Sequence, residues 1–310
     1  MGYGEERVRE SCESHPVVSM KIVNILGGLG NQMFEYAMYV AVQSAHPDEE
    51  VLCCTRCFKG YGLHNGYELK RVFGIDAKEA SLCQLAKLAY PFFNYKTWQV
   101  MRHCLPVRKK TMTRGALDIP FDYNQVLRDD SVYYDGYWQN EGFFVANRDA
   151  ILAAYSFSGI SDELNSRLLE QLDNEVSVSC HIRRGDYLNE PEMCVCTPDY
   201  YVRAILEMND RVKPTLYCIF SDDIPWCREH LDELGLSGLK VVFVDWNKGE
   251  NSFRDMQLMS RCNHNIIANS SFSWWGAWLG NRKGRVVMAP KTWAKGNVVN
   301  DPICVNWIRI

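Results

Sequence analysis

The chain has 310 residues, of which 47% are hydrophobic and 23% charged, so it is a folded protein with room for two domains. Its net charge of −4 argues against a general nucleic-acid binder, and any phosphate it holds must meet a local basic cluster. No apolar run is long enough for a transmembrane helix. Residues 1–19 are polar and lack the apolar centre of a signal peptide, so we treat them as a disordered N-terminal extension.

The thirteen cysteines are odd in number and scattered, which favours reduced thiols and a cytoplasmic location over a disulfide framework. Peripheral contact with the inner face of a membrane stays open. Two clusters, Cys53-Cys54-x-x-Cys57 and Cys194-x-Cys196, lack the second pair that a structural zinc site needs. We therefore expect neither a metal site nor a cofactor.

Residues 20–170 read as a first α/β domain. A buried strand over 21–26 leads into a tight glycine turn, and Asn31 is placed to cap the helix that follows. Further strands are predicted over 50–55 and 131–134, with helical patches such as 78–89 between them. The basic stretch 102–114 is typical of a solvated surface.

Residues 171–310 read as a second α/β domain. Ser161 is expected to cap a leucine-rich helix near the boundary. Alternation of strands and helices is typical of a parallel, doubly wound sheet, so we predict two Rossmann-like halves facing a cleft. The predicted strands of this half are 176–182, 215–220, 240–244, 265–268 and 285–288, with helices over 198–208 and 253–262.

The most informative motif is Cys180-His181-Ile182-Arg183-Arg184-Gly185-Asp186-Tyr187, at the end of a predicted strand. Ligands of open α/β sheets bind at the carboxyl ends of strands. Arginine stays charged and offers a planar fork of donors that suits a phosphate. The alternative is a surface loop in which the arginines meet Asp186 and water.

Three further motifs also follow predicted strands. The turn Gly27-Gly28-Leu29-Gly30 lacks the third glycine of a dinucleotide fingerprint, and no acidic residue ends the second strand, so a nicotinamide enzyme is disfavoured. Phe220-Ser221-Asp222-Asp223 is typical of a ligand contact or of a helix N-cap. Asn269-Ser270-Ser271-Phe272-Ser273-Trp274-Trp275-Gly276 opens a helix whose free N–H groups suit an anion, with the tryptophans as core or as a wall.

The sequence contains neither a D-x-D triplet nor a P-loop motif. A departing diphosphate would therefore depend on arginines and a helix start for its charge.

Together these four motifs, in this order, resemble the bacterial α-1,2-fucosyltransferases of glycosyltransferase family 11, from about residue 20 to the C-terminus. Gly136-Tyr137-Trp138-Gln139-Asn140-Glu141 matches a related block, and the N-terminal extension is the one departure. The resemblance implies a GT-B fold, GDP-fucose as donor, inversion at the fucose anomeric carbon and no metal requirement. The expected acceptor is a glycan ending in galactose, fucosylated on its 2-hydroxyl.

In this picture Arg183 clamps the β-phosphate, Arg184 and His181 support it, and Asp186 orients a guanidinium. The remaining expected contacts divide into two sets. Donor contacts are Ser221, Asp222, Ser270, Ser271, Phe272, Gly30, Asn31 and Gln32. Acceptor contacts are Tyr137, Trp138, Gln139 and Glu141. The general base stays open among Asp186, Glu35 and Glu141.

Two other hypotheses remain. One is a different GDP-sugar transferase, or a different fucose linkage, on the same fold. The other is a non-catalytic carbohydrate-binding protein, which would not need paired arginines beside a serine-rich helix start. The acceptor beyond its terminal galactose is not fixed by the sequence.

Overall fold

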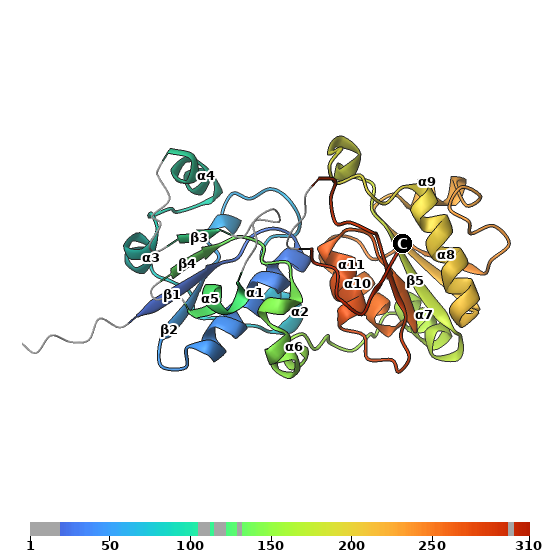
Figure 1. The fold of residues 1–310 in the computed structure, drawn as a ribbon, viewed down its shortest axis with the longest axis horizontal. Helices are drawn as coiled ribbons and strands as arrows, with labels where there is room; N and C mark the ends of the chain where they lie inside the picture. Colours follow the sequence, from blue (N-terminus) through green and yellow to red (C-terminus); the bar gives the residue numbers. More distant parts are fainter. Residues whose placement is uncertain (1–18, 105–111, 115–121, 129–131, 297–300) are drawn as a thin grey trace, which may run out of the picture.

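The structure is a computed structural model that describes residues 19–104, 112–114, 122–128, 132–296 and 301–310. Residues 1–18 of the N-terminal extension and much of the basic stretch 102–114 lie outside these residues. The chain forms two α/β halves side by side, each built on its own parallel sheet (Figure 1). The prediction of two α/β units with parallel sheets is confirmed.

The first sheet has the strand order β2-β1-β4-β3, with every neighbouring pair parallel. Parallel sheets are covered on both faces, and all five residues of β1 are buried as this requires. The strands and helices of this half are β1 (Met20–Asn24), α1 (Leu29–Ala45), β2 (Glu50–Cys54), α2 (Leu69–Phe73), α3 (Leu82–Leu88), α4 (Tyr95–Cys104), β3 (Met112–Arg114), α5 (Tyr123–Arg128), β4 (Val132–Asp135) and α6 (Arg148–Ala154).

The second sheet has the order β10-β9-β8-β5-β6-β7 and is also parallel throughout. Its central strand, β5, is buried along its whole length. The elements of this half are α7 (Glu163–Asn174), β5 (Ser177–Ile182), α8 (Pro198–Val212), β6 (Leu216–Ser221), α9 (Ile224–Glu229), β7 (Val241–Val244), α10 (Phe253–Arg261), β8 (His264–Ile266), α11 (Ser271–Trp278), β9 (Val287–Ala289) and β10 (Ile308–Arg309).

Helix α7 spans the predicted boundary near residue 170 and packs with the second sheet. Its Leu168 and Leu172 share a buried cluster with Leu216 of β6 and Leu258 of α10. Leu168 and Leu172 lie on the buried side of α7, which explains their helical spacing in the sequence. The exact division between the halves stays a prediction.

Three local predictions are corrected by the structure. Helix α1 starts earlier than expected, with Gly28 as N-cap, because the Asn31 N–H already donates to the Gly28 carbonyl at 2.9 Å. Asp162, not Ser161, caps α7 and accepts a hydrogen bond from the Asn165 N–H. The region 78–89 is helical only over α3, because residues 78–80 pair with the edge of β2 through Cys53.

The two halves share one hydrophobic core where α1 meets α11. The Phe34 ring of α1 lies 4.5 Å from the Trp274 ring and 4.9 Å from the Trp275 ring, measured between centroids. Trp274, Trp275 and Trp278 are all buried, so the interpretation of these tryptophans as core is confirmed. The first turn of α11 is therefore held rigidly against the first half.

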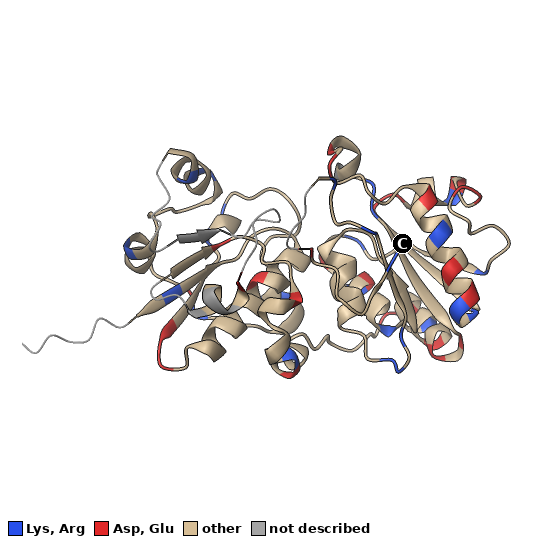
Figure 2. Cartoon of the chain, viewed as in Figure 1, with Lys and Arg blue, Asp and Glu red and all other residues tan. Residues whose placement is uncertain are grey.

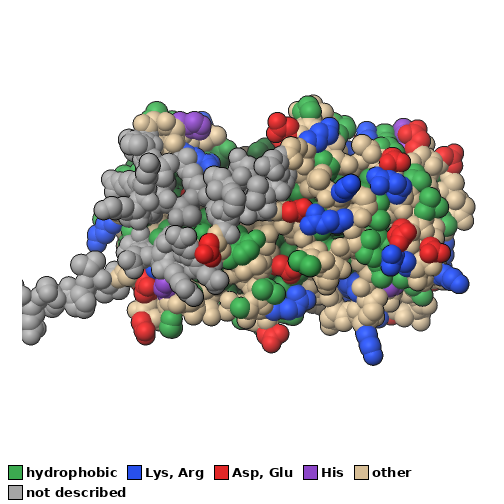
Figure 3. Space-filling model, viewed as in Figure 1, with side chains coloured by type: hydrophobic (Ala, Val, Ile, Leu, Met, Phe, Trp, Pro, Cys, Tyr) green, Lys and Arg blue, Asp and Glu red, His purple; other side chains and the backbone are tan. Residues whose placement is uncertain are grey.

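Charged side chains are mixed in sign over the outside of the protein. Lysines and arginines alternate with acidic residues along outer helices such as α8 (Figure 2). The face drawn in Figure 3 likewise intersperses both signs over the second half. No helix among the described residues has the length and apolar character needed to cross a bilayer.

Candidate active site

Two neighbouring strands, β5 and β6, end at the predicted arginine and acidic motifs. Ile182 lies opposite Ser221 in the parallel register, so the residues that follow emerge side by side. Nη1 of Arg183 lies 2.7 Å from Oδ2 of Asp222, with both side chains about one-quarter exposed. The strand ends thus carry a fixed guanidinium that still reaches solvent.

Arg184 is held in a different way. Its backbone N–H donates to Oδ1 of Asp222 at 2.9 Å. Its Nε lies 3.3 Å from Oδ2 of Asp223, and its guanidinium carbon lies 3.5 Å from the centre of the Trp226 ring. Cation–π stacking orients a guanidinium without using its donors, so the Arg184 fork keeps N–H groups for a ligand.

Asp222 and Asp223 have separate roles. Asp222 uses both carboxylate oxygens on the arginine loop, so the structure gives no support to its predicted contact with ribose or guanine. Asp223 is the N-cap of α9 and accepts from the Trp226 N–H, while Ser221 Oγ accepts from the Asp223 N–H. The prediction that this motif caps a helix is therefore confirmed for Asp223, and Ser221 stabilises the turn that leads into the helix.

Gly185 is required by this loop. A Cβ at position 185 would lie 2.4 Å from Oδ2 of Asp222, closer than real contacts allow. Glycine therefore lets the arginine loop fold over the Asp222 carboxylate. The side chain of the next residue, Asp186, lies outside what the structure describes, so its expected role stays a prediction.

His181 is the penultimate residue of β5, two positions before Arg183. Its side chain is buried, and burial, together with the nearby charge of Arg183, lowers the pKa of its imidazole to about 3. The ring is therefore neutral at physiological pH and adds no positive charge. Its Nδ1 atom has no hydrogen-bond partner among the residues that the structure describes, and its ring centroid lies 6.2 Å from that of Phe272.

Helix α11 begins at the carboxyl end of β8, next to β5 in the sheet. Its N-cap, Ser270, has extended backbone angles and makes no side-chain cap hydrogen bond. The first N–H groups of a helix lack partners within the helix and carry its positive dipole end. Ser270 and Ser271 add hydroxyl groups at this point. The predicted helix start is confirmed, and it follows the carboxyl end of β8 as the arginines follow that of the neighbouring β5.

Tyr187 joins the arginine loop to this helix start. Its hydroxyl donates to the Asn269 carbonyl at 3.0 Å, and Arg183 lies over its ring at 5.3 Å. The Asn269 side chain donates to the carbonyls of Met193 and Trp293 and so fixes the loop before α11. No role was predicted from the sequence for three residues within or beside the motifs, Tyr187, Asn269 and Trp226. A tyrosine or tryptophan at such a position could equally be part of the hydrophobic core.

Gly30, in the first half, contacts the start of α11. A Cβ on Gly30 would lie 2.7 Å from the Phe272 backbone nitrogen and from Oγ of Ser271. The glycine turn after β1 therefore touches the start of α11 backbone to backbone. This contact brings together the predicted donor residues Gly30, Ser271 and Phe272.

Asn31 and Gln32 differ in their positions. Asn31 Oδ1 accepts a hydrogen bond from Nε2 of Gln139 at 2.8 Å, which brings a predicted donor contact beside a predicted acceptor contact. Gln32 is fully buried. Its Nε2 donates to the carbonyls of Gly27 and Gly66, and its Oε1 accepts from the Glu68 N–H. Gln32 fastens a loop of the first half and is not brought to the arginines.

The predicted acceptor residues are also divided by the fold. Tyr137 is 45% exposed and lies against the glycine turn. Trp138 is buried, with its ring packed edge-on against Tyr134 and Phe143, so its predicted contact with a sugar has no support. Glu141 accepts from the indole N–H of Trp278 at 3.0 Å, on the interface between the halves.

Glu35, one of the candidate bases, is buried in α1. One of its oxygens accepts from the Leu26 N–H at 2.8 Å, and burial raises its pKa well above the usual range. Its carboxyl group therefore stays with the turn that it supports. Glu141 is likewise engaged with Trp278, so neither side chain is free to serve a substrate without rearrangement.

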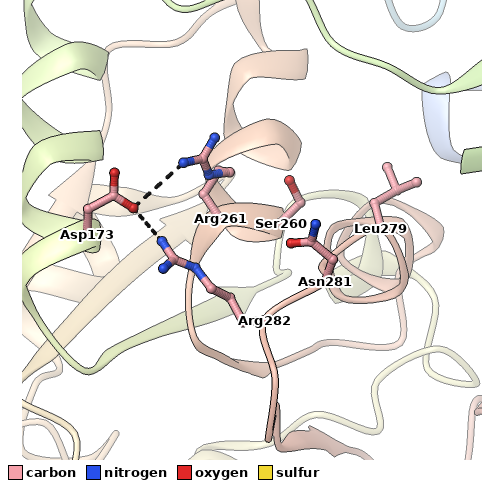
Figure 4. Close-up of a pocket in the computed structure, with 6 residues that line it drawn as sticks. All are labelled: Asp173, Ser260, Arg261, Leu279, Asn281 and Arg282. Carbon is pink, nitrogen blue, oxygen red and sulfur yellow. Dashed lines mark hydrogen bonds and ion pairs between the residues drawn. The ribbon is translucent and has the colours of Figure 1, made fainter. Parts of the chain in front are cut away.

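A surface pocket of about 450 Å³ lies elsewhere in the second half (Figure 4). Arg261 and Arg282 both pair with Asp173 there, and Ser260, Leu279 and Asn281 complete its lining. Asp173 precedes the start of β5, whereas Arg183 follows its end. The pocket is therefore at the opposite edge of the sheet and is not part of the candidate site.

Paired arginines and the start of α11, at the carboxyl ends of neighbouring strands, form a candidate site whose donors suit a phosphorylated ligand. A sequence profile described as "Glycosyl transferase family 11" matches residues 119–310. The chain is 32% identical to an "Alpha-1,2-colitosyltransferase" of Escherichia coli over 94% of its own length and 99% of that protein. The chain belongs to glycosyl transferase family 11 and is a glycosyltransferase.

Similarity to a second relative is lower. "Galactoside alpha-(1,2)-fucosyltransferase 2" of Hylobates lar is 25% identical, with 84% of this chain and 69% of that protein aligned. Among solved structures, the fucosyltransferase NodZ from Bradyrhizobium aligns over 84% of this chain and 93% of that one, at 13% identity and a TM-score of 0.45. The two parallel sheets, one in each half, give the chain its GT-B-type architecture, as predicted.

Proposed function

We propose that this glycosyltransferase transfers L-fucose from GDP-fucose to the 2-hydroxyl of a terminal β-galactose, with inversion and without a metal ion. The family and the similarity to a galactoside fucosyltransferase support the reaction class. The observation that supports the proposal is that Arg183, Arg184 and the start of α11 follow the carboxyl ends of the neighbouring parallel strands β5 and β8. Such a group of donors fits the two phosphates of a nucleoside diphosphate.

In this proposal the bond between the fucose anomeric carbon and the β-phosphate oxygen breaks, and a bond to the galactose 2-oxygen forms on the opposite face. Charge grows on the leaving diphosphate, where Arg183 stabilises it and the N–H groups of α11 add their dipole. These donors are fixed before the reaction, by Asp222 and by the Gly30 contact, so little reorganisation is needed as charge develops.

The galactose hydroxyl must lose its proton as the new bond forms. Glu35 and Glu141 are already engaged with protein groups. We therefore keep Asp186 for this role or for orienting a guanidinium. Asp186→Asn separates the two roles. If Asp186 is the base, the variant loses turnover but binds GDP normally; if Asp186 orients a guanidinium, the variant also binds GDP more weakly.

The direct test is incubation with GDP-fucose and lactose in the presence of a chelator, followed by linkage analysis of the product by NMR. A 2-linked α-fucoside formed without added metal is the expected result. Formation of another linkage, or a strict need for Mn²⁺, contradicts the proposal.

A second candidate is transfer of colitose, favoured by the 32% identity to the colitosyltransferase. Colitose is fucose without its 3-hydroxyl group, and the same diphosphate site would serve both donors. A competition between GDP-fucose and GDP-colitose in one reaction, resolved by the mass of the product, decides between them through the ratio of their kcat/KM values.

A further inference from the structure

A group of aromatic side chains outside the predicted motifs lies along the glycine turn of the first half. We name it the aromatic platform: Tyr61, His64, Tyr95 and Tyr137. The Tyr61 ring is 4.9 Å from that of Tyr95 and 6.2 Å from that of His64, measured between centroids. Three separate segments of the first half, the loop after β2, helix α4 and the loop after β4, supply these rings.

The rings make contact with the turn itself. Three atoms of the His64 ring lie 3.3 Å from the position of a Cβ on Gly28, and Cε1 of Tyr137 lies 3.4 Å from that of Gly27. His64 has φ of 60°, in the left-handed region that costs a non-glycine residue free energy. The fold tolerates this conformation while it holds the imidazole over the turn.

The platform remains open to solvent. Tyr137 is 45% exposed, His64 is exposed, and Tyr61 and Tyr95 are half-buried on the side that backs onto the core. Rings that only filled core would be covered on both faces. Here the core side is covered and the outer side is not.

The same turn joins the platform to the donor site. Gly30 touches Ser271 and Phe272 at the start of α11, while Gly28 and Gly27 touch the rings. Two residues of extended chain span at most about 7 Å, so the platform adjoins the expected diphosphate position at roughly the width of a sugar ring. Asn31 and Gln139, bonded to each other, lie in the same region and offer amide groups.

We propose that the platform binds the terminal galactose of the acceptor, with the apolar C–H face of the sugar stacked on Tyr61, His64 and Tyr137. The inference rests on the proposed function for the identity of the sugar. Aromatic faces with a few polar groups at their edge are the usual lining of a small-ligand site. Tyr137 was an expected acceptor contact, and Tyr61 and His64 are added by the fold.

The test measures lactose binding directly, by saturation-transfer NMR titration of the protein without donor. Tyr61→Ala and Tyr137→Ala should each weaken lactose binding about tenfold or more, as loss of a well-packed aromatic contact does. Tyr137→Phe keeps the stacking face and should stay within about threefold of the wild type. Phe93→Ala removes a ring that is 58% exposed outside the platform and should leave lactose binding unchanged.

GDP titration of the same variants identifies the occupant. Unchanged GDP affinity beside weakened lactose binding supports an acceptor platform. Weakened GDP affinity with normal lactose binding would assign the rings to the nucleotide and overturn the inference, as would normal lactose binding in both alanine variants. If the wild type binds lactose through these rings but does not transfer fucose, the proposed donor fails and the platform stands.

Discussion

The indole N–H of Trp275 donates to the backbone carbonyl of Gly30 at 3.0 Å, although 245 residues separate them in the chain. Gly30 belongs to the first turn of α1, and Trp275 lies in the middle of α11. The hydrogen bond fixes the start of one helix against the side of the other. It therefore sets the distance between the glycine turn of the first half and the start of α11 in the second.

Gly30→Ala tests how tightly the halves are joined. Alanine in place of glycine in a helix normally stabilises it by about 0.5–1 kcal/mol. Here the new Cβ would meet backbone atoms of α11 at 2.7 Å, and overpacking of this kind costs about 1–3 kcal/mol, so we expect net destabilisation in urea unfolding. Gly159→Ala, whose Cβ meets nothing within 4 Å, is the matched control and should not lower stability. Equal stability of both variants would contradict the close contact.

Arg183→Ala should reduce turnover with GDP-fucose by about 10²–10³, the usual loss for a donor that stabilises developing charge. Arg183→Lys should remain poor, because a point charge does not reproduce the guanidinium fork that Asp222 aligns. Steady-state kinetics with saturating acceptor measure both. Near-normal turnover of the alanine variant would remove Arg183 from the mechanism.

Asp222→Asn tests whether the carboxylate positions the arginines. The variant keeps an oxygen for the Arg184 N–H but loses the charge opposite Arg183, and we expect kcat to fall about 10–100-fold, because small displacements of catalytic groups are costly. The control is Asp245→Asn, which breaks an exposed ion pair with Arg228 and should leave kcat unchanged. A similar kcat for the two variants would show that Asp222 is dispensable.

The lowered pKa of His181 leads us to expect that the stability of the protein depends on pH. Its folded pKa of about 3 lies below the ordinary 6.5, so the unfolded chain binds a proton in this range and the folded chain does not. The stability it contributes is fully present above pH 6.5 and declines as the pH falls from 6.5 toward 3. Urea unfolding of His181→Gln should show a smaller loss of stability between pH 7 and 5 than the wild type shows. Identical pH slopes would mean that the imidazole is not buried in its neutral form.

The parallel strands of both halves were predictable, because strands buried on both faces leave continuous apolar runs in the sequence. The short strands β3 and β10 were not, since two or three residues carry no periodicity and depend on their neighbours for pairing. The helix caps at Asn31 and Ser161 were each misplaced, because several cap-forming residues lie together and hydrogen bonding in three dimensions chooses one.

The meeting of the arginine, acidic and serine motifs at one edge of the sheet was likewise predictable, since each motif follows a strand and the carboxyl ends of parallel strands meet at one edge. The engagement of Asp222 with the arginine loop, the burial of Gln32 and the positions of the expected acceptor residues were not. Trp138 and Tyr137 are adjacent, and the sequence could not show that one ring enters the core while the other reaches solvent. Tyr61 and His64 lie in a loop without periodicity, and only the fold brings His64 to Gly28 and the Tyr61 ring near that of His64.

Calorimetric titration with GDP in the presence of a chelator tests the central claim most directly, because it isolates the diphosphate site from acceptor and chemistry. We expect the wild type to bind GDP without metal. Arg183→Ala should weaken this binding by about tenfold or more, since a charge-assisted hydrogen bond is lost. Binding that requires a divalent cation, or equal affinity in the two proteins, would contradict it.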